Sequence, residues 1–252
     1  MEILAINFLI FLFGLCVGSF LNVLIYRLPH FLTIAGRSFC PKCKKRILWQ
    51  DNIPLVSFIL LGGKCRFCHS PISFQYPLVE LGTGILTVFL FWFYSYNFFY
   101  LIFNLLIFYA LIVVFVSDWR YQIVPDQVIY PAIGISLAKL AIFDGFRLNF
   151  FLSGFGAGLF FLILYFATFQ KGMGMGDVKL AFLMGLILGF PKIILALYLS
   201  FLTGAFFGVI LILVGKKRFG EHVPFGPFLC GATFISLFWG EEIIKWLTAH
   251  FF

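Results

Sequence analysis

The segment FFYLIFNLLIFYALIVVFVSDWRYQIVPD, residues 98–126, indicates the fold class of this chain. Its apolar part, 98–116, carries no charged side chain, and its length is close to the roughly 20 residues that a helix needs to cross a bilayer. The run ends just before Asp118, in a short polar segment that closes with Asp126. The stretch is therefore predicted to be a membrane-spanning helix that delivers a carboxylate to one membrane surface.

The composition of the whole chain supports a membrane protein. Of its 252 residues, 62% are hydrophobic, 38 are phenylalanine and only 11% are charged. A soluble domain of this size cannot bury so much apolar surface, so the expected partner is the lipid bilayer. The excess of 18 basic over 10 acidic residues is interpreted as a topology signal, and no nucleic acid is expected as a partner.

Apolar runs and their polar breaks predict an all-α polytopic membrane protein of about eight transmembrane helices. The first run is too long for a signal peptide and lacks a cleavage site, so we expect it to be retained. The sixth is short for a span, which is tolerated where a helix lines a cavity inside a bundle. The expected spans are 3–27, 77–95, 98–116, 127–143, 148–169, 178–190, 192–214 and 227–248.

Basic residues predict the orientation of the chain. They are concentrated between the first two spans and recur after the seventh, and cytoplasmic loops carry such an excess. This places the segments 28–76, 117–126, 170–177 and 215–226 in the cytoplasm and both termini outside. The residues concerned are Arg27, Arg37, Lys42, Lys44, Lys45, Arg46, Lys64, Arg66, Lys216, Lys217 and Arg218.

The first cytoplasmic loop contains CPKCKKRILWQDNIPLVSFILLGGKCRFC, residues 40–68. Its two C-x2-C pairs, Cys40/Cys43 and Cys65/Cys68, have the spacing of a structural zinc site with four thiolates. Two disulfides are the weaker alternative, because disulfides seldom persist in the cytoplasm. His69 is interpreted as a bystander. A closed shell of four thiolates leaves no position for substrate, so the zinc is expected to organise the loop.

Two carboxylates are expected at breaks between spans on the same side of the membrane. Asp118 ends the third span, and Asp177 follows alternating glycines in GMGMGDVKL, residues 172–180. Both could simply cap a helix or be solvated, and for Asp126 an N-cap fits well. However, the helix dipole disfavours Asp118 at a C-terminal end, and the glycines beside Asp177 leave room for a second backbone. Asp118 and Asp177 are therefore predicted to form a dyad that shares a proton and hydrolyses peptides.

These motifs resemble the type IV prepilin peptidases, bacterial membrane aspartic proteases with a GxGD signature. The resemblance rests on GSFLNVLIYRLP (18–29), the double C-x2-C loop, QYPLVELGTG (75–84), the IVPD segment, GMGMGDVKL and VPFGPFLCGA (223–232). It implies that Asp118 and Asp177 are catalytic. The expected domains are a first transmembrane helix (1–27), a cytoplasmic zinc-binding domain (28–76) and a seven-helix catalytic domain (77–252).

The resemblance also implies a location, a substrate and a second activity. Such enzymes lie in the bacterial inner membrane and cleave the basic leader of prepilins or pseudopilins at its cytoplasmic face. Many then methylate the new N-terminus with S-adenosylmethionine. Gly63, Lys64 and Glu80 are candidates for that methylation site, although Glu80 could instead cap its helix.

Two other interpretations are weighed against this one. A proton- or metal-coupled transporter also places acids in broken helices, but such proteins usually show repeat symmetry between their halves, and none is visible here. A presenilin-like protease shares the GxGD signature, but the cysteine loop and the GSFLNV motif favour the prepilin group.

Overall fold

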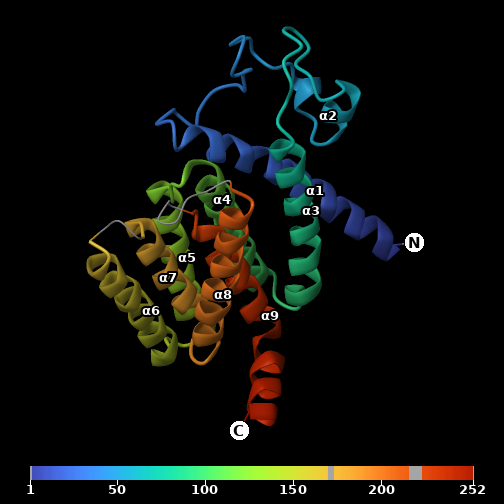
Figure 1. Ribbon diagram of the computed structural model, residues 1–252. Coiled ribbons are helices and arrows are strands. Elements are labelled where there is room, and N and C mark those ends of the chain that lie inside the picture. The colour runs from blue at the N-terminus through green and yellow to red at the C-terminus, as the bar shows by residue number, and fades with distance from the viewer. Residues whose placement is uncertain (1, 170–172, 216–222, 252) are drawn as a thin grey trace. The chain divides into compact units, whose positions relative to one another are not determined.

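The computed structural model describes residues 2–169, 173–215 and 223–251, and these are almost entirely helical (Figure 1). The basic residues Lys216, Lys217 and Arg218 used to predict orientation lie outside the described ranges. In chain order the elements are α1 (Glu2–Arg27), η1 (Trp49–Asn52), α2 (Val56–Leu60), α3 (Gln75–Tyr94), α4 (Phe98–Tyr121), α5 (Asp126–Phe143), α6 (Leu148–Ala167), α7 (Met175–Leu188), α8 (Lys192–Leu213) and α9 (Gly226–Phe251).

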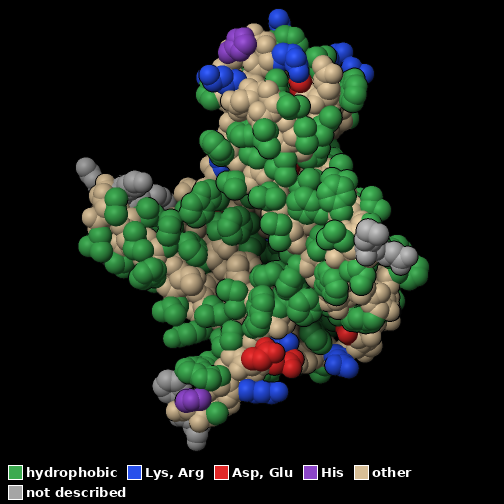
Figure 2. All heavy atoms as spheres, turned by 90° about the vertical axis from the view of Figure 1, so that its right-hand side faces the viewer, with side chains coloured by type: hydrophobic (Ala, Val, Ile, Leu, Met, Phe, Trp, Pro, Cys, Tyr) green, Lys and Arg blue, Asp and Glu red, His purple; other side chains and the backbone are tan. Residues whose placement is uncertain are grey.

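Seven helices in the described ranges are long and apolar enough to cross a membrane, and they match seven of the expected spans. The helix at the sixth expected span is α7, which has 14 residues and is not among those seven. Exposed apolar side chains cover the helices, as lipid-facing surfaces require (Figure 2). The all-helical membrane fold is thus confirmed, while the count of eight spans stays a prediction.

The chain forms two compact units, residues 1–113 and 114–252, and α4 crosses the division between them. In the first unit α1 packs along α3. A Cβ atom at Gly14 would lie 2.6 Å from Oγ1 of Thr87, and one at Gly18 would lie 2.7 Å from Cα of Glu80. The four-residue spacing of these two glycines therefore lets the two backbones meet, as small residues do between membrane helices.

The cysteine loop of the first unit folds into two knuckles with the same backbone. In the first knuckle the N–H of Cys40 donates a hydrogen bond to the carbonyl of Lys45, and in the second the N–H of Cys65 donates one to the carbonyl of Ser70. The preceding residues, Lys44 and His69, both adopt a positive φ, of 60° and 53°. The apolar run between the knuckles forms α2, a helix of five residues, and so is not a further span. We call residues 37–74 the cysteine module.

In the second unit α7 is surrounded by protein and contacts α5, α6, α8 and α9. Its closest approach is to α6, where a Cβ atom at Gly185 would collide with the backbone of Ser153 and Gly154. Leu180, Leu183 and Met184 are fully buried. A helix enclosed in this way need not span the hydrocarbon, which explains why a short helix is tolerated here.

Candidate functional site

The four cysteine thiols of the module converge on one point. The Sγ atoms of Cys40, Cys43, Cys65 and Cys68 all lie within 4.8 Å of one another, and those of Cys40 and Cys68 are 3.8 Å apart. All four cysteines are free thiols, so the alternative of two disulfides is not supported. His69 is not part of this group. Four converging thiols are the donor set of a structural zinc site, so the cluster fits zinc.

Asp118 lies in the last turn of α4 and is buried, with 6% of its surface exposed. Its Oδ2 atom accepts a hydrogen bond of 2.8 Å from the backbone N–H of Gly226, the first residue of α9. The C-terminal end of α4 disfavours a negative charge, whereas the N-terminal end of α9 favours one. The N-terminal end of α9 therefore stabilises the negative charge of Asp118, which its own helix α4 does not.

Asp177 lies in the first turn of α7, outside the seven spanning helices, and is 8% exposed. Its Oδ2 atom accepts a hydrogen bond of 3.2 Å from the N–H of Gly174. Gly174 is the N-cap of α7, so Asp177 is not the N-cap residue; it is the third helical residue, and its side chain accepts a hydrogen bond from the N-cap backbone. Burial raises the pKa of its carboxyl to about 7, and the negative charge of Asp118 contributes to this rise.

Asp126 does not have the N-cap role expected from the sequence. Pro125 takes the cap position with an extended backbone, and α5 begins at Asp126 without a side-chain cap. The Asp126 carboxylate instead accepts a hydrogen bond of 2.6 Å from Nζ of Lys179, which also lies over the ring of Tyr130. This ion pair joins the start of α5 to the first turns of α7, two residues beyond Asp177.

The three candidates for methylation have different local surroundings. Oε2 of Glu80 accepts a hydrogen bond of 2.8 Å from the N–H of Leu55, whose φ of 58° aims that N–H at α3. Glu80 is thereby buried and fastens the cysteine module to α3, and it does not cap that helix. Gly63 packs on the ring of Phe58, while Lys64 is exposed. These contacts leave a shared site for S-adenosylmethionine a proposal.

Three contacts were not visible in the sequence because their partners are remote along the chain. They are the N–H of Gly226 on Asp118, the pair Asp126–Lys179 and the anchor Glu80–Leu55. A weak signal existed for each, since Gly226, Lys179 and Glu80 all lie within the motifs that carry the resemblance. Each stretch contributes a residue that orients a functional region.

Fold and site together define a class: a polytopic helical membrane protein that buries two interacting carboxylates in one helix bundle and carries a four-cysteine module. Comparison with known families agrees. Residues 12–94 match the bacterial peptidase A24 N-terminal domain, and residues 105–209 match the type IV leader peptidase family. The chain therefore belongs to the type IV leader peptidase family, which confirms the resemblance.

Relatives named prepilin leader peptidase/N-methyltransferase match nearly end to end. That of Aeromonas hydrophila is 36% identical, covering 96% of this chain and 94% of its own length. Those of Legionella pneumophila and Bacillus subtilis are 33% and 32% identical, covering 95% and 94% of this chain and 93% and 96% of their own lengths. No solved structure matched the chain.

Proposed function

We propose that this chain is a membrane aspartic endopeptidase that cleaves the leader peptide of type IV prepilins or pseudopilins. The observation that carries the proposal is the pairing of Asp118 and Asp177. The two carboxyls come from different helices of one bundle, both are buried, and each is held by a backbone N–H. Membership of the type IV leader peptidase family and the names of the relatives support the same activity.

The surroundings of the two carboxyls suggest a division of roles. Asp118 faces a helix N-terminus and a short hydrogen bond, which favour its ionised form, whereas Asp177 keeps a proton to about pH 7. In this scheme Asp118 takes a proton from water, the water oxygen attacks the scissile carbonyl, and Asp177 donates its proton to the carbonyl oxygen. When the resulting diol collapses, Asp118 passes its proton to the leaving amine and Asp177 takes a proton back from the diol. One water is consumed and the proton ends on the dyad, which is the chemistry of aspartic proteases.

The proposed location is the bacterial inner membrane, with the catalytic side facing the cytoplasm and both termini outside. The charge distribution of the connecting loops supports this orientation. Zinc held by Cys40, Cys43, Cys65 and Cys68 would fix the fold of the cysteine module and take no part in the reaction. The proposed domains are those expected from the sequence: a first transmembrane helix (1–27), a cytoplasmic zinc-binding domain (28–76) and a catalytic transmembrane domain (77–252).

Methylation of the new N-terminus is proposed as a second activity, on the strength of the relatives' names. S-adenosylmethionine would supply the methyl group. Gly63, Lys64 and Glu80 remain proposed residues for this step, but the engagement of Glu80 with Leu55 argues that its contribution is to hold the module.

The test is a reaction between the full-length protein, reconstituted in lipid, and a prepilin, followed by measurement of product mass. Loss of the leader supports the peptidase, and a further gain of one methyl group upon adding S-adenosylmethionine supports the second activity. A proton- or metal-coupled transporter, the alternative, would leave the prepilin intact and move its ion across the vesicle. An unchanged prepilin mass under conditions where the protein is folded would overturn the proposal.

A further inference from the structure

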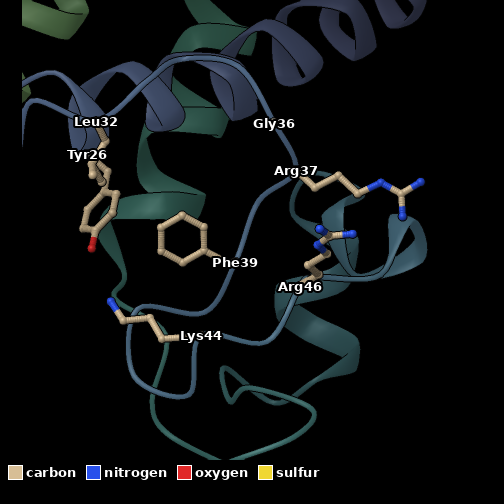
Figure 3. Close-up of a pocket in the computed structure, with 7 residues that line it drawn as sticks. All are labelled: Tyr26, Leu32, Gly36, Arg37, Phe39, Lys44 and Arg46. Atoms are coloured by element: carbon tan, nitrogen blue, oxygen red, sulfur yellow. The ribbon is translucent and has the colours of Figure 1, made fainter.

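A hollow of about 660 Å³ opens in the first unit, where the end of α1 meets the first cysteine knuckle (Figure 3). Neither the carboxylate dyad nor the zinc ligands line it. Phe39 stands near its centre with Tyr26 beside it, at a centroid distance of 6.4 Å. The lining residues are Tyr26, Leu32, Gly36, Arg37, Phe39, Lys44 and Arg46.

One wall of this hollow is shaped by Arg27, the last residue of α1. Its guanidinium is buried and donates hydrogen bonds to five successive backbone carbonyls, from Thr33 to Arg37. The chain is thereby curled around a positive charge, which also lies 5.8 Å from the ring of Phe39. The carbonyls that surround Arg27 are neutral and do not cancel its positive charge. That charge therefore still contributes to the electrostatic potential of the hollow.

The lining itself adds three more cations and no acid. Arg37, Lys44 and Arg46 are all exposed, and the ion pairs of the described residues involve other cations, namely Arg66, Lys179 and Lys192. The acidic residue of the cysteine module, Asp51, forms an ion pair with Arg66. Such a hollow repels a basic leader peptide and a sulfonium, and it attracts an anion. Guanidinium groups bind phosphate particularly well because they present two parallel donors.

The position of the hollow indicates which kind of phosphate-bearing molecule would bind there. Tyr26 belongs to the last turn of a membrane-spanning helix, so the hollow lies where that helix leaves the bilayer. The segment that follows exposes a run of apolar side chains, with Phe31 91% exposed and Leu32 and Ile34 more than 40% exposed. Cations next to exposed apolar side chains match a ligand with a charged head and hydrocarbon tails.

We propose that this hollow binds the headgroup of an anionic phospholipid, with the phosphate held by Arg37 and Arg46, Lys44 adding positive charge on the other side of Phe39, and the acyl chains beside Leu32 and Tyr26 (Figure 3). Bound lipid would neutralise the cations and fix the cysteine module at the membrane surface. The proposal does not depend on the peptidase reaction. It requires only that the module lies at the surface of the membrane that α1 spans.

The test uses the full-length, zinc-loaded protein in a neutral detergent and counts bound lipids by native mass spectrometry during titration with phosphatidylglycerol or phosphatidylcholine. The pocket variant is Arg37→Gln with Arg46→Gln. The matched control is Lys42→Gln with Lys45→Gln, which removes the same charge from exposed positions of the same knuckle that do not line the hollow. Lys44→Gln provides a second, milder pocket variant, and zinc content verifies that each variant is folded.

The wild-type protein should bind phosphatidylglycerol in preference to phosphatidylcholine. The double pocket variant should lose roughly tenfold or more in affinity, since each basic residue near a membrane surface contributes on the order of 1 kcal/mol, and Lys44→Gln should lose less. The control should change clearly less than the double pocket variant. Equal loss in pocket variant and control, or no preference between the lipids, would overturn the site. Displacement of the lipid by inorganic phosphate at equal concentration would instead identify a soluble phosphate ligand and overturn the lipid assignment.

Discussion

The dyad of Asp118 and Asp177 and the thiols of the cysteine module both unite distant parts of the chain, but different forces hold them. The dyad lies in a bundle where the side chains of α7 are packed on several sides, with Leu180 and Leu183 fully buried. From residue 29 to 74, by contrast, Cys40 is the only buried apolar side chain. Burial of apolar area can hold the first region, whereas the second has almost no core, so we expect it to depend on a metal held by its four thiols.

The two regions are therefore sensitive to different changes. A packed bundle tolerates the loss of a single polar group but not a shift of its helices, so its function is sensitive to small displacements. A module held by metal is insensitive to such shifts as long as four thiolates remain.

The largest effect is expected from the carboxylates. Asp118→Asn or Asp177→Asn should each lower prepilin cleavage by about 10³-fold or more, because general acid–base catalysis contributes on this scale. The double variant should be no worse than either single one, since the two carboxyls act as a unit. Product mass gives the rate, and thermal unfolding should show that the bundle is intact. Near-normal turnover in either single variant would exclude that aspartate from catalysis.

The cysteine module should fail structurally when its metal is lost. The purified protein should contain about one zinc per chain, and Cys43→Ser or Cys65→Ser should release it. Structural zinc contributes about 10–16 kcal/mol to such folds, so residues of the module should become open to proteolysis while the helices of the second unit stay protected. Cys16→Ser, outside the cluster, is the control. A metal-free module that resists protease as well as the native one would refute this dependence on metal.

A smaller effect is expected from Gly226, which orients Asp118. A Cβ atom at this position would lie 2.8 Å from Oδ2 of Asp118, so Gly226→Ala should displace the carboxylate. We expect a loss of about 10²-fold in kcat with little change in KM, the usual cost of misplacing a catalytic group by about 1 Å. Gly231→Ala lies in the same helix and meets no atom within 4 Å, so it should leave the rate unchanged. Equal cleavage rates for Gly226→Ala and Gly231→Ala would show that Gly226 does not position Asp118.

The pH dependence should be the mildest effect. Burial and the charge of Asp118 raise the pKa of Asp177 to about 7, so this carboxyl holds its proton below that pH and loses it above. If Asp177 is the acid, the cleavage rate should fall by roughly tenfold per pH unit as the pH rises beyond about 7. Rates measured across this range, with thermal stability followed in parallel, give the comparison. A rate that stays level well above neutral pH would assign the acid to another group.

Much of this architecture follows from local sequence. Apolar runs of spanning length, two C-x2-C pairs and acids at span ends are each encoded within short stretches, so they can be recognised without the fold. The role of Asp126 was missed because its partner, Lys179, belongs to another helix and is brought near only by packing. The expected span 178–190 was displaced relative to α7, which begins three residues earlier, at Met175, and ends two residues earlier, at Leu188, because hydropathy extends to Phe190. Contacts made by backbone groups, such as the N–H of Gly226, leave no trace in side-chain patterns.

The hydrogen bond from Gly226 to Asp118 also restricts how the enzyme can stabilise its tetrahedral intermediate. An N–H already donated to Asp118 is not available to an oxyanion, so this helix end cannot serve as an oxyanion hole. In the proposed scheme, the negative charge that develops on the attacked oxygen is met by the proton of Asp177. An inhibitor that mimics the intermediate with a hydroxyl group should therefore bind to the singly protonated pair, and its affinity should weaken as that proton is lost.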